Sequence, residues 1–297
     1  MTVLAPPWPR TNALLSDRTL AVRTALSPNP DAPNAVFIHG LGGSSLNWTD
    51  LMALLQPQVN GYAIDLGGFG GSPPPRDGNM TPAGHARGVA RFIAAQKLAP
   101  VHLFGNSMGG AVALQLAANR PDLVRSLTLI APALPELRPR KSSAHLPVIA
   151  LPGVGEKLMD RYAELDVAQR VQATMDMCFA DSSRVPPQRM EEAIASATEH
   201  EGYPYAAETF LATLRGLLKT YFDPGPNRPW KLAEKVTAPT LVIYGRQDPL
   251  VDPRAAHRVT KHFPNAHVVV LPDSGHVPQM EHPDFVAAAW HRFIPLT

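Results

Sequence analysis

The chain has 297 residues, of which 45% are hydrophobic and 18% are charged, a balance typical of a folded globular protein rather than a disordered one. Its formal net charge is only +2, and the basic residues are scattered along the chain. Because nucleic-acid binding needs clustered positive charge, we expect no nucleic-acid partner. The length permits one large domain with room for an inserted subdomain.

The cysteine content and the lengths of the apolar segments indicate where the protein is located and whether it inserts into a membrane. Cys178 is the only cysteine, which excludes an internal disulfide and leaves too few thiolates for a structural zinc site. We expect it to be a buried free thiol. The amino terminus lacks the continuous apolar stretch of a signal peptide, and no run of about 18 apolar residues occurs. A cytoplasmic protein without stable membrane insertion is therefore expected.

Short apolar runs alternate with longer segments of helical period. This alternation predicts an α/β fold, with a mostly parallel central sheet flanked by helices. The expected strands are Leu20–Leu26, Ala35–His39, Tyr62–Asp65, Val101–Phe104, Ser126–Ile130, Thr240–Tyr244 and His267–Leu271. The expected helices around this sheet are Thr81–Gln96, Met108–Asn119, Pro253–His262 and Pro283–Phe293.

The strand pattern lapses between Pro132 and Lys235. This segment consists of helical pieces broken by prolines, and the pieces are Gly155–Met177, Pro187–Thr198 and Ala206–Tyr221. Because the strand pattern resumes at Ala238, the segment interrupts one sheet rather than following it. We therefore expect residues 1–131 and 236–297 to form the core domain and residues 132–235 to form an inserted helical cap.

A candidate nucleophile lies where an apolar run meets Gly-x-Ser-x-Gly and an Ala-rich helical segment. Residues 101–110 read Val-His-Leu-Phe-Gly-Asn-Ser-Met-Gly-Gly. A serine in a sharp turn between strand and helix is typical of a nucleophile elbow, and the glycines allow a turn with no room for Cβ atoms. The helix amino terminus also favours negative charge. The sequence predicts Ser107 as the nucleophile.

A serine hydroxyl needs a base near neutral pH, and neutral histidine suits this task. Of the eleven histidines, His276 follows the last expected strand in a Gly-containing loop, at the same sheet edge as Ser107. We expect His276 to be the general base. His257, His262 and His267 are spaced by five residues, which fits neither one helix face nor a zinc motif, so we expect surface or packing roles for them.

The base in turn needs a carboxylate that fixes its tautomer and stabilises the imidazolium. Asp248 follows the expected strand Thr240–Tyr244 and gives the chain order Ser, Asp, His. We expect Asp248 to fill this role. Asp252 is the alternative, although it could instead cap the helix that opens at Pro253.

Two backbone N–H groups should bind the oxyanion of a tetrahedral intermediate. The expected donors are Met108, directly after the nucleophile, and Leu41, in the Gly-rich loop after strand Ala35–His39. His39 is expected to support that loop rather than to transfer protons. The second Gly-rich stretch, Asp65–Ser72, lacks both phosphate-binding glycine patterns, so we expect it to be a structural turn.

Together these motifs resemble those of the α/β-hydrolase superfamily across nearly the whole chain. The resemblance implies a serine hydrolase that needs no metal or organic cofactor. The Gly-Gly-Ser-Ser loop with Trp48 looks like that of carboxylesterases and lipases, which favours a small-molecule ester substrate. The turn at residues 105–110 is similar to that of carbon–carbon hydrolases of aromatic ring-fission products, which usually carry Gly-Pro-Gly in the oxyanion loop and an aromatic residue in place of Val277.

Two further expectations concern the class of function and the helical cap. A non-catalytic ligand-binding member of the same fold is a more distant alternative, because fold does not dictate function. Some apolar cap side chains should line the substrate pocket, while others pack the cap onto the core. The cap candidates are Met175, Met177, Phe179, Tyr203, Tyr205, Phe210 and Tyr221. The sequence carries no signal for an oligomeric state.

Overall fold

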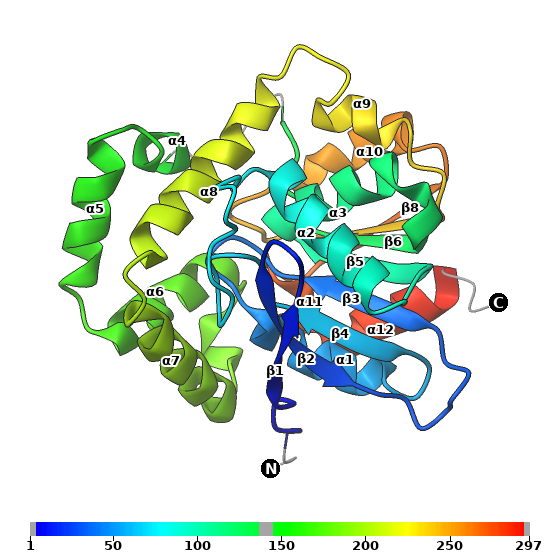
Figure 1. The fold of residues 1–297 in the computed structure, drawn as a ribbon, viewed down its shortest axis with the longest axis horizontal. Coiled ribbons are helices and arrows are strands. Elements are labelled where there is room, and N and C mark those ends of the chain that lie inside the picture. The colour runs from blue at the N-terminus through cyan, green and yellow to red at the C-terminus, as the bar shows by residue number, and fades with distance from the viewer. Residues whose placement is uncertain (1–3, 137–144, 294–297) are drawn as a thin grey trace.

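The computed structural model describes residues 4–136 and 145–293 and shows one eight-stranded sheet with helices on both faces (Figure 1). The strand order is β1-β2-β4-β3-β5-β6-β7-β8. The strands β1 and β2 are antiparallel, as are β2 and β4, and the other neighbouring pairs are parallel. The expected α/β fold with a mostly parallel sheet is therefore confirmed.

The seven expected strands are all present, with ends within two residues of the predicted ones. With one additional strand at the amino terminus, the full set is β1 (Arg10–Leu14), β2 (Thr19–Ala25), β3 (Asn34–Ile38), β4 (Asn60–Ile64), β5 (Val101–Asn106), β6 (Val124–Ile130), β7 (Thr240–Gly245) and β8 (Ala266–Leu271). Strand β1 was not predicted. Its side chains are exposed or half-buried, so it has no apolar periodicity and depends on backbone pairing with β2.

Helices cover the two faces of the sheet unequally. The helices α2 (Pro82–Ala95), α3 (Met108–Asn119), α9 (Pro229–Ala233) and α10 (Ala256–His262) pack on one face and share one apolar core. The helices α1 (Thr49–Leu55) and α12 (Pro283–Phe293) pack on the other, around the buried Trp48 and Trp290. Helix α2 begins where expected, because the Thr81 side chain accepts from Gly84 N–H at 3.1 Å and Pro82 occupies the first turn.

Five helices lie together beside the sheet region, drawn in green to yellow in Figure 1. They are α4 (His145–Ile149), α5 (Val154–Ala163), α6 (Val167–Cys178), α7 (Pro187–Glu201) and α8 (Ala206–Tyr221). The expected single piece 155–177 is two helices, since Asp166 caps a new helix by accepting from Ala168 N–H at 2.8 Å. Within the ranges expected for core and cap, residues 1–3, 137–144 and 294–297 lie outside the described residues.

The end of the expected cap lies against the sheet region. Helix α9 contacts α3 and α10, and the indole Nε1–H of its Trp230 donates to the carbonyl of Pro135 at 2.8 Å. The cap boundary at residue 235 stays a prediction. Across residues 4–136 and 145–293, no helix is both long enough and apolar enough to cross a bilayer.

Candidate active site

Ser107 occupies the turn between β5 and α3, with φ 54° and ψ −120°. A residue other than glycine in such a conformation costs on the order of 1–3 kcal/mol, so the surroundings must hold it. The Ser107 N–H donates to the carbonyl of Ile130 at 2.9 Å, and its own carbonyl accepts from Gly110 and Ala133, also at 2.9 Å. The sharp turn predicted around Ser107 is therefore present and held by backbone hydrogen bonds.

Glycine is required on both sides of this turn. A Cβ atom at Gly105 would overlap the carbonyl oxygen of Gly109, and one at Gly109 would overlap the carbonyl oxygen of Ile38. Neither neighbour is a flexible side chain, so a larger residue would displace the backbone. The two glycines thus bring helix α3 into direct contact with strands β5 and β3.

His276 and Asp248 form a buried pair. The Nδ1–H of His276 donates to Asp248 Oδ2 at 2.9 Å, and Asp248 is fully buried. The other carboxylate oxygen accepts from the N–H groups of Leu250 at 2.7 Å and Val251 at 2.9 Å. A carboxylate held in this way keeps the ring proton of neutral His276 on Nδ1. Nε2 is then unprotonated and can accept a proton from another group.

Asp252, the alternative carboxylate, has different partners. It accepts from the Arg254 N–H at 2.9 Å and from the Arg254 guanidinium at 2.8 Å. It caps the short helix that begins at Pro253, which is the other role expected for it from the sequence. The structure therefore brings Asp248 to His276 and places Asp252 at a helix terminus.

The loop after β3 passes directly beside Ser107. A Cβ atom at Gly40 would lie 3.2 Å from the Ser107 Cβ. Within residues 4–136 and 145–293, no acceptor takes a hydrogen bond from the N–H of Leu41 or of Met108. Both expected oxyanion donors are therefore available to a ligand bound at the serine.

His39 and Asp65 support the two Gly-rich loops. The buried His39 donates from Nδ1 to the Gly40 carbonyl at 2.7 Å and accepts at Nε2 from Leu66 N–H at 2.9 Å, which requires a neutral ring. Burial also lowers the pKa of His39. Asp65 accepts from the N–H groups of Ser45 at 2.6 Å and Gly71 at 2.9 Å. Both the supporting role of His39 and the structural turn at Asp65 agree with expectation.

Asn106 is a site residue that sequence reasoning missed. Its buried side-chain amide donates to the carbonyls of Ile130 and His276, both at 3.1 Å. It therefore joins the turn that carries Ser107 to the loop that carries His276. Its place directly before the serine was the only available signal, because the partner loop is 170 residues away in sequence.

Helix α8 supplies side chains that lie against both Gly-rich loops. A Cβ atom at Gly42 would lie 3.4 Å from Cε2 of Phe210. The neighbouring Thr209 packs so closely on Gly68 that a Cβ atom there would overlap its methyl group. Phe210 is therefore the expected pocket residue with a direct contact to the oxyanion loop.

The other cap candidates divide between four environments. Met175 and Phe179 form a small apolar cluster with Val277, directly after His276. Tyr221 packs against the core of the sheet domain. Tyr203 and Tyr205 stack on each other with ring centroids 5.3 Å apart, and Met177 is 38% exposed.

Cys178 differs from the expectation of a buried thiol, because it is half-buried. Desolvation nevertheless raises the pKa of this thiol to about 12, so it remains protonated at neutral pH. Its backbone carbonyl accepts from His276 N–H at 2.7 Å. No group of three or more His, Cys, Asp or Glu side chains among the described residues could hold a metal ion.

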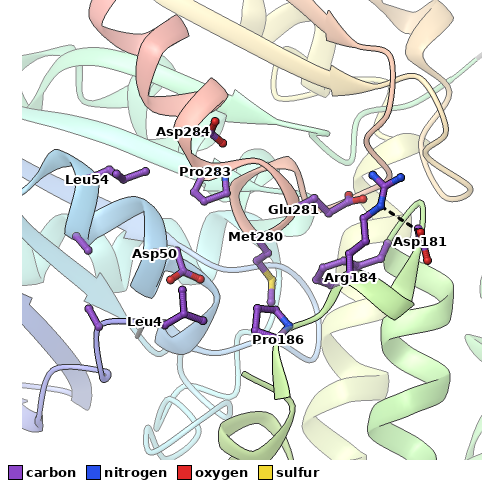
Figure 2. Close-up of a pocket in the computed structure, with 13 residues that line it drawn as sticks. Leu4, Asp50, Leu54, Asp181, Arg184, Pro186, Met280, Glu281, Pro283 and Asp284 are labelled. Carbon is purple, nitrogen blue, oxygen red and sulfur yellow. Dashed lines mark hydrogen bonds and ion pairs between the residues drawn. The ribbon is translucent and has the colours of Figure 1, made fainter. Parts of the chain in front are cut away.

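A cavity of about 430 Å³ lies where the amino-terminal segment, α1, residues 179–186 and α11 (Pro278–Glu281) meet (Figure 2). Its lining residues are Leu4, Ala5, Asp50, Ala53, Leu54, Phe179, Asp181, Arg184, Pro186, Met280, Glu281, Pro283 and Asp284. Ser107, Asp248 and His276 are not among them. The cavity therefore lies apart from the candidate catalytic residues.

Two curated bacterial proteins resemble the chain over most of its length. The chain is 28% identical over 279 residues to a pimeloyl-[acyl-carrier protein] methyl ester esterase of Neisseria meningitidis serogroup B, strain H44/76, with 89% of this chain and 94% of the relative covered. It is 27% identical over 267 residues to a 2-hydroxy-6-oxononadienedioate/2-hydroxy-6-oxononatrienedioate hydrolase of Cupriavidus pinatubonensis. This alignment covers 89% of this chain and 86% of the relative.

A third relative is longer than this chain. It is the dihydrolipoyllysine-residue acetyltransferase component of the acetoin cleaving system of Cupriavidus necator. The two are 30% identical over 259 residues, and the match covers 84% of this chain and 60% of the relative. Among solved structures, 2-hydroxy-6-oxo-6-phenylhexa-2,4-dienoate hydrolase from Rhodococcus sp. strain RHA1 matches with a TM-score of 0.76 and 22% identity, covering 96% of this chain and 98% of that one. This likeness shows a shared fold.

The family model described as "alpha/beta hydrolase fold" matches residues 34–283, which include β3 to β8, the helical segment and the Ser107, Asp248 and His276 positions. The resemblance read from the motifs is thereby confirmed, and the similar proteins include an esterase and a second hydrolase. The chain belongs to the α/β-hydrolase family.

Proposed function

We propose that the protein is a serine hydrolase that cleaves carboxylic esters of a small to medium apolar substrate, without a cofactor. The observation that carries the proposal is the buried pair of His276 and Asp248, at the sheet edge where Ser107 stands in its strained turn. These residues follow β8, β7 and β5, and the carboxyl ends of parallel strands form the ligand-binding edge of such a sheet.

Acylation would begin with attack by the Ser107 hydroxyl oxygen on the ester carbonyl carbon. Nε2 of His276 takes the hydroxyl proton, and Asp248 stabilises the imidazolium that results. The carbonyl oxygen becomes an oxyanion, which the N–H groups of Leu41 and Met108 would stabilise by hydrogen bonds. The carbon–oxygen bond to the alcohol then breaks, and His276 returns the proton to the leaving alcohol.

Deacylation would repeat these steps with water as the nucleophile. His276 takes a proton from water, the resulting hydroxide attacks the acyl-enzyme carbonyl, and the proton passes to the Ser107 oxygen as the carboxylic acid leaves. His276 carries every proton transfer, and the two backbone donors stabilise the oxyanion, so the proposed route uses no metal. The ester-cleaving Neisseria relative supports this reaction class.

The first test is covalent labelling of the purified protein with a fluorophosphonate, followed by mass spectrometry of the labelled peptide. We expect one label on Ser107 and none in Ser107→Ala. A folded protein that takes no label would instead support the non-catalytic, ligand-binding alternative.

Carbon–carbon bond hydrolysis of ring-fission products remains the second candidate. The Cupriavidus pinatubonensis relative and the Gly-Asn-Ser-Met-Gly-Gly turn at residues 105–110 favour it. The Gly42-Gly43-Ser44 sequence and Val277 differ from the usual carbon–carbon hydrolase pattern, which is why we place esters first. An ester panel of graded chain length, assayed beside one vinylogous diketo acid, distinguishes the two reactions. A cytoplasmic location and the absence of a nucleic-acid partner stay predictions from the sequence.

A further inference from the structure

We propose that Glu281, the last residue of α11, positions His276. The Glu281 carboxylate joins the loop that carries His276 to residues 178–180 of the helical cap. The cap would then help to set the geometry of the catalytic histidine, in addition to covering the substrate. This inference rests on the proposed function of His276. It concerns a residue that touches no reacting atom and acts through its neighbours.

One carboxylate oxygen of Glu281 holds the histidine loop. Oε1 accepts from the Gly275 N–H at 2.7 Å and from the Ser274 hydroxyl at 3.1 Å. These two buried residues directly precede His276. Because the loop is short, fixing them limits where the imidazole can lie relative to Asp248.

The other carboxylate oxygen holds the cap. Oε2 of Glu281 accepts from the Ala180 N–H at 2.8 Å. In the opposite direction, the His276 N–H donates to the carbonyl of Cys178 at 2.7 Å. A Cβ atom at Gly275 would lie only 2.6 Å from both Ala180 N and the Cys178 oxygen, so the two segments are in close contact.

A carboxylate suits this junction because both of its oxygens are acceptors and all three partners are donors. An amide would direct an NH₂ group at one of these donors, so Glu281→Gln loses one side of the junction. Figure 2 shows Glu281 in the wall of the cavity, where the nearby Arg184 pairs with Asp181 at 3.1 Å. The Glu281 oxygens accept from two backbone N–H groups and from the Ser274 hydroxyl.

The test compares Glu281→Gln with Glu156→Gln in the full chain. Glu156 is a matched control, because its carboxylate accepts from the Gly153 N–H at 2.7 Å and from Arg215 at 2.8 Å within the cap, away from the histidine loop. We expect Glu281→Gln to lower kcat by about 10- to 100-fold, the range for a small misplacement of a catalytic group, with KM little changed. Glu156→Gln should keep the parent kcat.

A spectroscopic measurement separates positioning from general destabilisation. The low-field proton resonance of the His276 Nδ1–H reports its hydrogen bond to Asp248, and Glu281→Gln should shift or broaden it while Glu156→Gln leaves it unchanged. This signal does not depend on turnover. A shifted resonance in a protein that labels no serine would therefore support the positioning role while contradicting the proposed function.

Ala180→Pro provides a second variant that leaves Glu281 intact. It removes the cap donor and places the proline Cδ where the N–H pointed at Glu281 Oε2, so that oxygen must move away. The preceding Phe179 already has the extended conformation that proline requires, with φ −85° and ψ 151°. We expect the same change in the resonance, with a smaller loss of kcat. If both variants keep the parent resonance and kcat, or if Glu281→Gln unfolds while Ala180→Pro behaves like the parent, the positioning role is wrong.

Discussion

The turn that carries Ser107 and the loop that carries His276 are held in different ways. The turn depends on backbone hydrogen bonds and on two glycines, and its neighbours β5 and α3 are adjacent in sequence. The histidine loop is held by side chains and carbonyls from three separate regions, namely Asn106, Glu281 and the cap residue Cys178. The comparison shows that the Ser107 turn is held by the backbone of the sheet and helix around it, whereas the His276 loop also depends on side chains and on the helical segment at residue 178.

The largest expected effect comes from removing the nucleophile without disturbing its turn. Ser107→Ala should lower kcat by about 10⁴- to 10⁶-fold, because triad members act as a unit. The backbone bonds of Ser107 remain, so the melting temperature should stay close to that of the parent. Ester hydrolysis and thermal unfolding check both parts, and activity within tenfold of the parent would refute the assignment.

The second effect concerns the carboxylate that orients the base. Asp248→Asn should lower kcat by up to about 10⁴-fold, on the precedent of the serine-protease triad, because it leaves the imidazole in the wrong tautomer. Asp252→Asn is the matched control and should cost far less, since Asp252 caps a short helix. The measurement is kcat/KM for one ester, and the reverse ranking would transfer the role to Asp252.

Two glycine substitutions test the comparison directly. Gly105→Ala should mainly lower stability, by about 1–3 kcal/mol, because the added Cβ overlaps the backbone of Gly109 inside the core. Gly275→Ala should mainly lower kcat, by about 10-fold or more, because the cap backbone at Cys178 and Ala180 would be pushed away from the histidine loop. Denaturant unfolding and steady-state kinetics on both variants decide whether the two regions differ as described.

The smallest effect concerns the cap residue beside the oxyanion loop. If Phe210 bounds the acyl pocket, each added methylene that fits should improve transition-state binding by about 0.8 kcal/mol, and Phe210→Ala should move the optimum to longer chains. Phe222→Ala is the matched control, because Phe222 is 84% exposed. A graded ester series read through kcat/KM tests this, and an unaltered optimum in Phe210→Ala would show that this side chain does not select the substrate.

The sequence by itself determined the sheet and the positions from which the candidate triad comes. Seven strands are apolar enough to be recognised from local patterns, and strand order then places the residues after β5, β7 and β8 at one edge. Strand β1 escaped prediction because its stability comes from pairing with β2 and not from its own apolar side chains. Helix α1 was likewise missed, although its core contacts are extensive.

Only the tertiary structure decided which partners complete the site. The choice between Asp248 and Asp252 depends on a 2.9 Å contact with His276, across 28 residues of sequence. The Asn106 contact spans 170 residues and the Glu281 contact with Ala180 spans 101. No local pattern encodes such contacts, because each joins two segments that are far apart in sequence and meet only in the folded protein.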